Sequence, residues 1–240
     1  MRIPRVFVNA ALQENSELSL EPGQSHYISR VLRLKPGASL ILFNGDGYQY
    51  PASIISDNRK SLQIHLEQKN KKEPAPSIHI HLALGLSKGD RFDTAIQKAT
   101  ELGVSEITPL LTEFNAVKLP QERMQKKQAH WQSIIQSACE QSERCYLPQL
   151  NPITTLSEWT AFSSYPQKLI LHPGSEQSFR DLKASAKLLM LIGPEGGLSD
   201  SEIDWARSNG FIAVKFGQHI LRTETAAMAA ITAAQTLWAW

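Results

Sequence analysis

Cysteine and long apolar runs are scarce in this chain of 240 residues. Its two cysteines, Cys139 and Cys145, have no second pair with which to form a zinc site, so we expect reduced thiols, no metal and a cytoplasmic protein. No uncharged apolar stretch approaches the roughly 18–20 residues that cross a bilayer, and no secretory leader is visible. These absences argue against a membrane protein, a secreted protein and a metalloprotein.

Phosphate-binding motifs are also missing from the most distinctive stretch. Gly193-Pro194-Glu195-Gly196-Gly197 matches neither GxGxxG nor GxxxxGK[ST], and it has no lysine for a triphosphate. An apolar run, 188–192, precedes it and predicts a strand buried on both faces; a capping box follows and predicts a helix over 200–209. Ligands of open α/β sheets bind at such junctions. We interpret the stretch as a binding loop, with an ordinary tight turn as the alternative.

Charge is unevenly distributed. Residues 1–73 hold 10 Lys and Arg against 7 Asp and Glu, whereas the remainder holds 15 against 16. A mildly basic first part is compatible with a polyanionic partner, although solvated charges produce similar differences. Residues 69–76 are charged and proline-rich, which is typical of a linker. We therefore predict two domains, 1–73 and 74–240.

Short strands and turns characterise the first domain. The patterns predict a hairpin turn at 44–47 and strands over 2–8, 39–43, 49–56 and 61–67. Strands at this spacing favour a small barrel, a shape frequent among nucleic-acid-binding modules.

One helix is expected in this first domain, over 26–33. Ile28, Val31 and Leu32 would form its apolar face, while Arg30 and Arg33, three apart, would lie near each other on its surface. The two arginines fit either an RNA contact or an ordinary solvated face.

Longer strands and helices alternate in the second domain. The strands are expected over 78–86, 107–111, 168–171, 188–192 and 211–214, and the helices over 91–102, 121–141, 200–209 and 226–238. Such alternation predicts a parallel sheet with helices on both faces. The last helix is rich in alanine, which suits core packing or a close contact across a dimer.

Three consecutive strands of this sheet end in unusual loops, 172–174, 193–197 and 217–225. The carboxyl ends of parallel strands share one edge of a sheet, so these loops should converge. We expect them to hold one compact ligand mainly through backbone groups.

Several of these motifs together resemble a known family. IGPEGG before a helix, ILRTETA before an alanine-rich helix, HYISRVLRLKPG at 26–37, LFNGDG at 42–47, KGDRFDTAIQKATELGV at 88–104 and ACEQSERCYLP at 138–148 occur in order along the whole chain. The sequence resembles the bacterial small-subunit rRNA uridine-N3 methyltransferases, which belong to the SPOUT superfamily of knotted methyltransferases.

The resemblance implies a fold and a reaction. It implies a PUA-like β-barrel over 1–73 that binds RNA, and an α/β SPOUT domain over 74–240 whose chain forms a deep trefoil knot. It further implies S-adenosylmethionine bound in the knot, a homodimer, and a uridine of 16S rRNA in the small ribosomal subunit as the substrate methylated at N3.

The resemblance also nominates site residues. Arg222 would stabilise the uridine anion, with a salt bridge to Glu195 or Glu224 as the alternative role, and those two carboxylates are candidates for proton acceptor or cofactor positioning. Cofactor contacts are expected from Leu171, His172, Pro173, Ile192, Gly193, Pro194, Gly196, Gly197, Phe216, Gly217, Ile220, Leu221, Thr223, Thr225 and Ala226. RNA contacts are expected from Arg2, Arg5, Arg30, Arg33, Lys88, Arg91 and Arg144.

Three other functions remain open at this stage. A non-catalytic RNA-binding assembly protein could keep the same fold, and a SPOUT methyltransferase could act on tRNA, for example at a ribose 2′-hydroxyl. An enzyme of nucleotide phosphates is disfavoured by the missing phosphate-binding motif.

Overall fold

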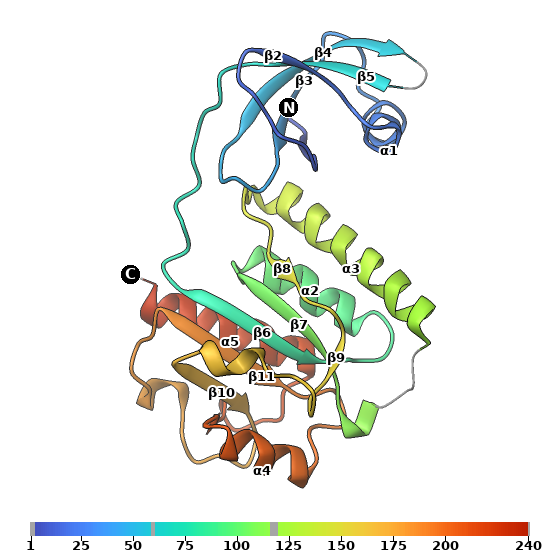
Figure 1. Cartoon of the computed structure of the whole chain (residues 1–240). Coiled ribbons are helices and arrows are strands. Elements are labelled where there is room, and N and C mark those ends of the chain that lie inside the picture. Colours follow the sequence, from blue (N-terminus) through green and yellow to red (C-terminus); the bar gives the residue numbers. More distant parts are fainter. Residues whose placement is uncertain (1–2, 59–60, 116–119, 240) are drawn as a thin grey trace. The chain divides into compact units, whose positions relative to one another are not determined.

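The computed structural model describes residues 3–58, 61–115 and 120–239 (Figure 1). The chain divides into two compact units. The first comprises residues 1–75 together with 139–147, and the second comprises 76–138 and 148–240. Arg2, a predicted RNA contact, lies outside the described residues.

The first unit is built on a five-stranded sheet of order β1-β3-β4-β5-β2. Its strands are β1 (Arg5–Phe7), β2 (Ser16–Ser19), β3 (Ser39–Phe43), β4 (Tyr50–Asn58) and β5 (Ser61–Leu66). β1 pairs with β3 in parallel, and the other pairs are antiparallel. Inward-facing residues alternate along β3, β4 and β5 and form the core, including Leu40, Leu42, Ile54, Leu62 and Ile64.

The helix predicted over 26–33 has a different course. It consists of α1 (Pro22–His26) and a π-helical segment, η1 (Tyr27–Val31), in which the Leu32 amide donates to the Tyr27 carbonyl, five residues back. This wider turn rotates Val31 out of the predicted apolar face, and its side chain is 59% exposed. Arg33 lies beyond the helix with a φ of +56°, so Arg30 and Arg33 do not share a helix surface.

The segment 139–147 contacts the start of the chain within the first unit. The Arg5 side chain is only 7% exposed and lies over the Phe43 ring, 5.1 Å from its centroid. Its Nη2 donates to the carbonyl oxygens of Glu143, at 3.2 Å, and Arg144, at 3.3 Å. Arg5 therefore ties two distant parts of the chain together.

The predicted linker is partly attached to the first unit. The Glu73 carboxylate accepts hydrogen bonds from the backbone amides of Cys145 and Tyr146, and the Glu73 amide donates to the Gly47 carbonyl at 2.8 Å. The Lys69 and Lys72 ammonium groups lie over the Tyr48 ring. Its composition suggested a free linker, but residues 69–73 of this segment contact the unit that precedes it.

The second unit contains the predicted parallel sheet. Its order is β12-β10-β11-β6-β7-β8, with β9 also pairing with β7, and every pair is parallel. The strands are β6 (His79–Gly85), β7 (Glu106–Leu111), β8 (Gln149–Leu150), β9 (Thr154–Thr155), β10 (Gln167–Leu171), β11 (Lys187–Ile192) and β12 (Ile212–Val214). β11 lies between β10 and β6, which explains its continuous apolar run.

Helices cover this sheet on both faces (Figure 1). They are α2 (Arg91–Glu101), α3 (Gln121–Ser142), α4 (Asp200–Ser208) and α5 (Thr223–Trp238), with 3₁₀ turns η2 (Glu113–Asn115), η3 (Ala161–Ser164) and η4 (Phe179–Asp181). Ile203 and Ala206 of α4 share a core cluster with Leu189 and Leu191 of β11. α5 lies against β11 and α2. Since alternate residues of a strand face opposite sides, β11 is buried between two helical layers.

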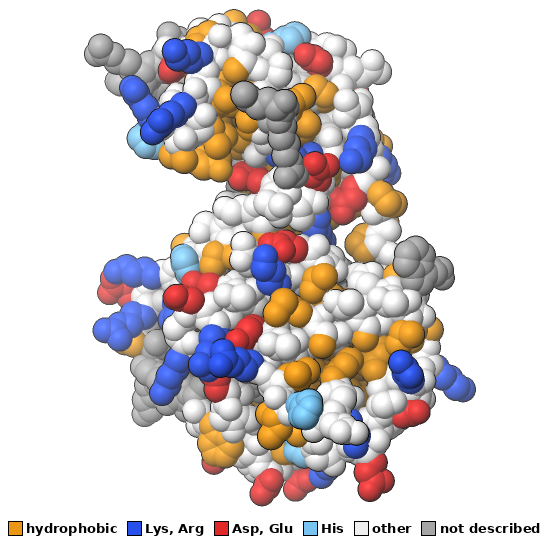
Figure 2. All heavy atoms as spheres, turned by 180° about the vertical axis from the view of Figure 1, so that it is seen from behind, with side chains coloured by type: hydrophobic (Ala, Val, Ile, Leu, Met, Phe, Trp, Pro, Cys, Tyr) orange, Lys and Arg blue, Asp and Glu red, His pale blue; other side chains and the backbone are white. Residues whose placement is uncertain are grey.

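One face of α5 is not covered by the rest of the described second unit. A groove there is lined by small and apolar residues, and Figure 2 shows apolar side chains gathered on this side of the second unit. The α5 residues that line it are Thr225, Met228, Ala229, Thr232, Ala233, Thr236 and Leu237. Phe179, which stacks on Trp238 with ring centroids 4.6 Å apart, borders the groove.

A polar cluster lies near the amino ends of β6 and β7. His81 is fully buried, and its Nε2 lies 2.7 Å from Thr108 Oγ1. Glu106 accepts hydrogen bonds from Tyr165 and Asn151, both at 2.6 Å. Burial lowers the pKa of His81 to about 4, despite the nearby Glu106 charge. Although burial alone would raise it, these hydrogen bonds bring the pKa of Glu106 below its usual value.

No helix in the described part of the chain is long and apolar enough to cross a membrane. Among the same residues, no group of three or more His, Cys, Asp and Glu side chains is arranged to hold a metal ion.

Candidate functional site

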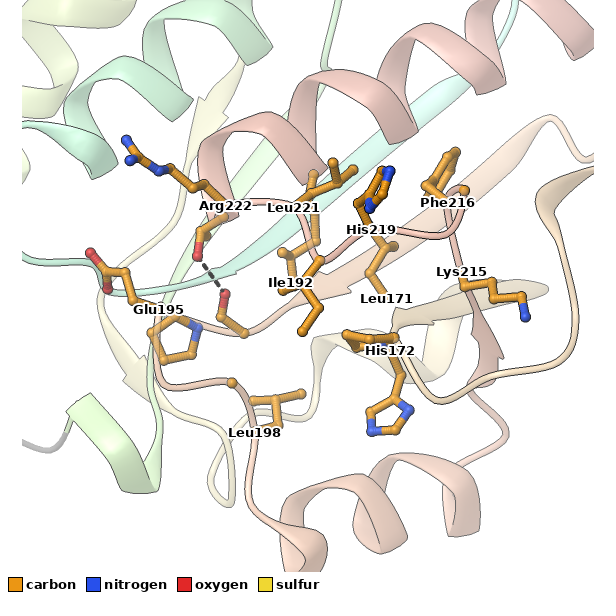
Figure 3. Close-up of a pocket in the computed structure, with 18 of the residues that line it drawn as sticks. Leu171, His172, Ile192, Glu195, Leu198, Lys215, Phe216, His219, Leu221 and Arg222 are labelled. Atoms are coloured by element: carbon orange, nitrogen blue, oxygen red, sulfur yellow. Dashed lines mark hydrogen bonds between the residues drawn. The ribbon is translucent and has the colours of Figure 1, made fainter.

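The loops after β10, β11 and β12 meet at one pocket of about 470 Å³ (Figure 3). This volume lies within the usual range for small-molecule sites. Because all three strands are parallel, their carboxyl ends share one edge of the sheet, where such sites form. The first loop contributes Leu171, His172 and Pro173. We call this cavity the strand-end pocket.

Glycines allow the second loop to fold tightly on itself. A Cβ on Gly193 would lie 3.0 Å from the carbonyl carbon of Gly197 and from Cγ of Leu198, which is tighter than most Cβ contacts in proteins. Gly197 has a φ of +74°, which favours glycine. The loop then enters α4 through a capping box of Ser199 and Glu202, as the sequence predicted.

The third loop is tied to the second by α5. This helix begins at Thr223, three residues earlier than expected, with Arg222 as its N-cap. The Thr223 hydroxyl donates to the Gly193 carbonyl at 3.2 Å, which is the dashed line in Figure 3. The residues expected as the end of a loop therefore form the first turn of a helix.

Most residues predicted to contact a cofactor line this pocket. Thirteen of the fifteen do so: Leu171, His172, Pro173, Ile192, Gly193, Pro194, Gly197, Phe216, Gly217, Ile220, Leu221, Thr223 and Ala226. Gly196 and Thr225 do not; Gly196 faces a neighbouring cavity, and Thr225 faces the α5 groove. Ile220, one of these thirteen, lines the pocket although it is 83% exposed.

The pocket has further lining residues that the sequence reasoning missed. Leu198, Val214, Lys215, Gln218 and His219 belong to it. Gln218 and His219 lie within the loop expected over 217–225, Leu198 directly follows Gly197, and Val214 and Lys215 directly precede Phe216. Taking every residue of each loop with the last residue of the preceding strand and the first residue after the loop would have included all five.

Charged groups gather at one end of the strand-end pocket. Figure 3 shows Arg222 and Glu195 at this end, with Lys215 and Phe216 at the other. Glu195 Oε1 accepts from Arg91 Nη1 at 3.1 Å and from the Lys88 amide at 3.3 Å. Among the described residues, no ion pair joins Arg222 to Glu195 or to Glu224. The salt bridge considered as an alternative role for Arg222 is therefore absent from this part of the structure.

A second cavity adjoins that end. It shares Arg91, Pro194 and Glu195 with the strand-end pocket, and its other lining residues are Leu86, Lys88, Gly89, Asp90, Thr94, Phe114, Gly196 and Glu224. Oε2 of Glu224 is buried and has no hydrogen-bond partner among the described residues. We call this cavity the side pocket.

The residues predicted to contact RNA fall into an exposed group and a buried group in the structure. Arg30 and Arg33 are exposed on the first unit, and Lys88 and Arg91 are exposed at the rim of the side pocket. Arg5 and Arg144 are each only 7% exposed, and burial lowers the pKa of Arg144. The interpretation of Arg5 and Arg144 as surface contacts is therefore corrected: both are buried within the first unit.

Comparisons with known proteins show the family of this chain. An RNA methyltransferase domain profile matches residues 73–235, and an RNA methyltransferase PUA domain profile matches 20–67. The ribosomal RNA small subunit methyltransferase E of Buchnera aphidicola (subsp. Schizaphis graminum) is 36% identical over 98% of this chain and 96% of its own length. The enzyme of the same name from Bacillus subtilis is 29% identical, covering 95% of this chain and 94% of its own.

Solved structures give the same result. A Legionella pneumophila protein crystallised with S-adenosylmethionine has a TM-score of 0.93 at 37% identity, covering 98% of both chains. The ribosomal RNA small subunit methyltransferase E of Neisseria gonorrhoeae, also bound to S-adenosylmethionine, has a TM-score of 0.90 at 34% identity, covering 99% of this chain and 98% of its own. The chain therefore belongs to the ribosomal RNA small subunit methyltransferase E family.

Proposed function

We propose that this protein transfers a methyl group from S-adenosylmethionine to N3 of a uridine in 16S rRNA of the small ribosomal subunit. The observation that carries the proposal is the convergence of three strand-end loops on one pocket, with Arg222 and two carboxylates at its edge, in a chain of this family. Since the substrate is a ribosomal subunit, we place the reaction in the cytoplasm.

The strand-end pocket has the right chemistry for this cofactor. Apolar walls from Leu171, Ile192 and Leu221 suit an adenine ring, and the exposed backbone of the glycine loops can bond ribose and methionine groups. Gly193 leaves room where a side chain would collide with the loop. Bound there, S-adenosylmethionine supplies a methyl group that is already activated by the sulfonium.

The residues of the chain must then activate the uridine as a nucleophile. Its N3 carries a proton and becomes a good nucleophile when that proton leaves. As the proton leaves, negative charge develops on the base, and a positioned guanidinium stabilises such charge. Arg222 has this role in our proposal, because it borders the pocket and, among described residues, is in no ion pair.

Glu224 is the better placed of the two candidate proton acceptors. Glu195 already accepts two hydrogen bonds, from Arg91 and the Lys88 amide. Glu224 has a buried carboxylate oxygen without a donor among the described residues, and such an oxygen is costly unless a donor arrives. In our proposal the N3–H of uridine is that donor. Its proton moves to Glu224 while N3 takes the methyl group, and Glu195 orients Arg91.

The two parts of the chain have separate roles in this proposal. Residues 1–73 form a PUA-like RNA-binding domain, with Arg30 and Arg33 as exposed phosphate contacts. Residues 74–240, apart from the segment 139–147 that belongs to the first unit, form the SPOUT domain in this proposal. Its chain passes through itself as a deep trefoil knot around the loops of the strand-end pocket.

We also propose a homodimer formed through α5. Its uncovered groove presents small residues such as Ala229 and Ala233 beside Met228 and Leu237, a surface that permits close approach of a second helix. Exposed apolar patches of this kind mark interaction sites. Light scattering of the wild-type protein and of the Ala229→Lys variant tests this proposal. We expect the wild type to be a dimer and the variant to be a monomer. A wild type that is monomeric at micromolar concentration would contradict the proposed dimer.

One experiment tests the proposed reaction directly. Small subunits from cells lacking this protein are incubated with purified protein and methyl-labelled S-adenosylmethionine, and modified nucleosides are mapped by mass spectrometry. We expect 3-methyluridine at one position of 16S rRNA. Label on tRNA or on a ribose would refute the proposed specificity, and absence of both label and cofactor binding by calorimetry would leave a non-catalytic RNA-binding protein.

A further inference from the structure

Phe114 has an unusual position for a large aromatic side chain. It belongs to η2, the short turn after β7, and is 56% exposed. It lines the side pocket together with Pro194 and Glu224, beside the edge of the strand-end pocket. An exposed apolar ring at a cavity costs free energy in water, so this ring is a candidate for contact with a ligand.

Phe114 is also packed closely against the glycine loop. Gly196 approaches it so nearly that a Cβ at this glycine would lie 3.0 Å from Phe114 Cβ. A side chain at position 196 would crowd the Cβ of Phe114, so one of the two residues would have to shift. Glycine at this position therefore leaves room for Phe114 beside the side pocket.

The other walls of the side pocket suit a nucleobase. Leu86 and Pro194 are buried apolar side chains, so the cavity offers apolar surface besides the Phe114 ring. Glu224 supplies a buried carboxylate oxygen that needs a donor, and uracil carries an N–H donor at N3. Lys88 is exposed at the rim of the side pocket, where its ammonium group can bind an RNA phosphate next to the base.

We infer that the side pocket receives the target uracil and that Phe114 is the platform on which this base stacks. The inference rests on the proposed function and adds a specific residue to it. Enzymes that modify a base remove it from its stack and hold it against aromatic or apolar side chains. The shared wall of Arg91, Pro194 and Glu195 places a base in the side pocket next to the strand-end pocket, which would hold the cofactor.

Variants of Phe114 separate stacking from simple apolar contact. Phe114→Ala and Phe114→Leu both remove the aromatic face, but the second keeps an apolar side chain of similar size. We expect kcat/KM for small subunits to fall by about 5- to 150-fold in both, the range that base–aromatic stacking supplies. Affinity for S-adenosylmethionine should stay within about twofold of wild type by calorimetry. Phe114→Trp should restore most of the activity, because it restores the aromatic face.

Ile212→Ala is the matched control, since Ile212 is an exposed apolar residue of the second unit on β12, away from the side pocket. We expect it to leave kcat/KM unchanged. Wild-type kcat/KM in Phe114→Ala, or full activity in Phe114→Leu, would overturn the stacking role even if 3-methyluridine forms normally.

A binding measurement separates this inference from the proposed reaction. Saturation-transfer NMR with uridine 5′-monophosphate, on protein loaded with S-adenosylhomocysteine, should show contact of the uracil ring protons in wild type and Phe114→Trp. The signal should be lost in Phe114→Ala. Equal or absent signals in wild type and Phe114→Ala would overturn the inference, whereas a wild-type protein that binds the nucleotide but forms no 3-methyluridine would overturn the proposed function alone.

Discussion

Acid should destabilise the second unit through His81. The imidazole is fully buried, and the buried environment lowers its pKa from 6.5 to about 4. The unfolded chain binds a proton near pH 6.5, whereas the folded chain does not until about pH 4, so the stabilisation from a neutral His81 is complete above pH 6.5 and is lost as pH falls. Glu106, whose pKa is also lowered, adds a loss in the same direction at more acidic pH.

The size of this effect follows from the shift. Each pKa unit corresponds to about 1.4 kcal/mol, so we expect the free energy of unfolding to fall by about 2 kcal/mol between pH 7 and pH 5, and by about 3 kcal/mol at pH 4. Urea denaturation followed by circular dichroism at a series of pH values measures it. Proton NMR of the His81 ring gives the pKa directly.

Two variants make the assay specific. His81→Phe keeps an aromatic ring beside Trp159, whose ring lies edge-on to His81 at 5.7 Å, and removes the titrating group. We expect it to lose most of the pH dependence between pH 7 and pH 5. His219→Gln, at an exposed position of the same unit, should retain it. A His81 midpoint near pH 6.5, or an unchanged pH slope in His81→Phe, would refute the reasoning.

Other substitutions probe the site and the first unit. Glu224→Gln removes the proposed proton acceptor, so the single-turnover methylation rate should fall by about 10²- to 10⁴-fold with unchanged cofactor affinity. A wild-type methylation rate in Glu224→Gln would show that solvent, and not Glu224, accepts the N3 proton of uridine. Gly193→Ala places a Cβ 3.0 Å from the carbonyl carbon of Gly197. The free energy of unfolding measured in urea should therefore fall by about 1–3 kcal/mol. An unchanged free energy of unfolding would show that the loop shifts to accommodate the added methyl group. Replacing Arg30 and Arg33 with Glu should weaken binding to small subunits and flatten its salt dependence. Cofactor affinity should not change, and its parallel loss would indicate misfolding.

The parallel sheet could be predicted from the sequence because its strands are buried on both faces. The apolar run 188–192 corresponds to β11 within one residue, and the strand over 211–214 corresponds to β12. By contrast β2, whose sequence is SELS, has a single apolar residue, so neither periodicity nor composition marks it. Its pairing with β5, which is distant in the chain, creates it.

The site was predictable where backbone geometry dictates the residue type. The glycines at 193 and 197 indicate a tight loop. The parallel strands place that loop at the same sheet edge as the loops after β10 and β12. The buried state of Arg5 was not predictable, because its acceptors are carbonyls about 140 residues away, and any basic residue near a terminus resembles a surface charge. Phe114 was missed for a similar reason: an isolated aromatic carries no pattern, and only the fold brings it beside Gly196.

The return of residues 139–147 to the first unit has a consequence for biosynthesis. A chain growing on the ribosome presents residues 1–75 long before that segment exists. Until residue 147 has emerged, the Arg5 guanidinium lacks the carbonyls of Glu143 and Arg144, and Glu73 lacks the amides it accepts from. The first unit therefore cannot complete its folding first, although it starts the chain. Release of the amino-terminal 75 residues as a separate fragment should yield a partly folded species, in which ionic and polar groups that belong inside the native unit remain open to water.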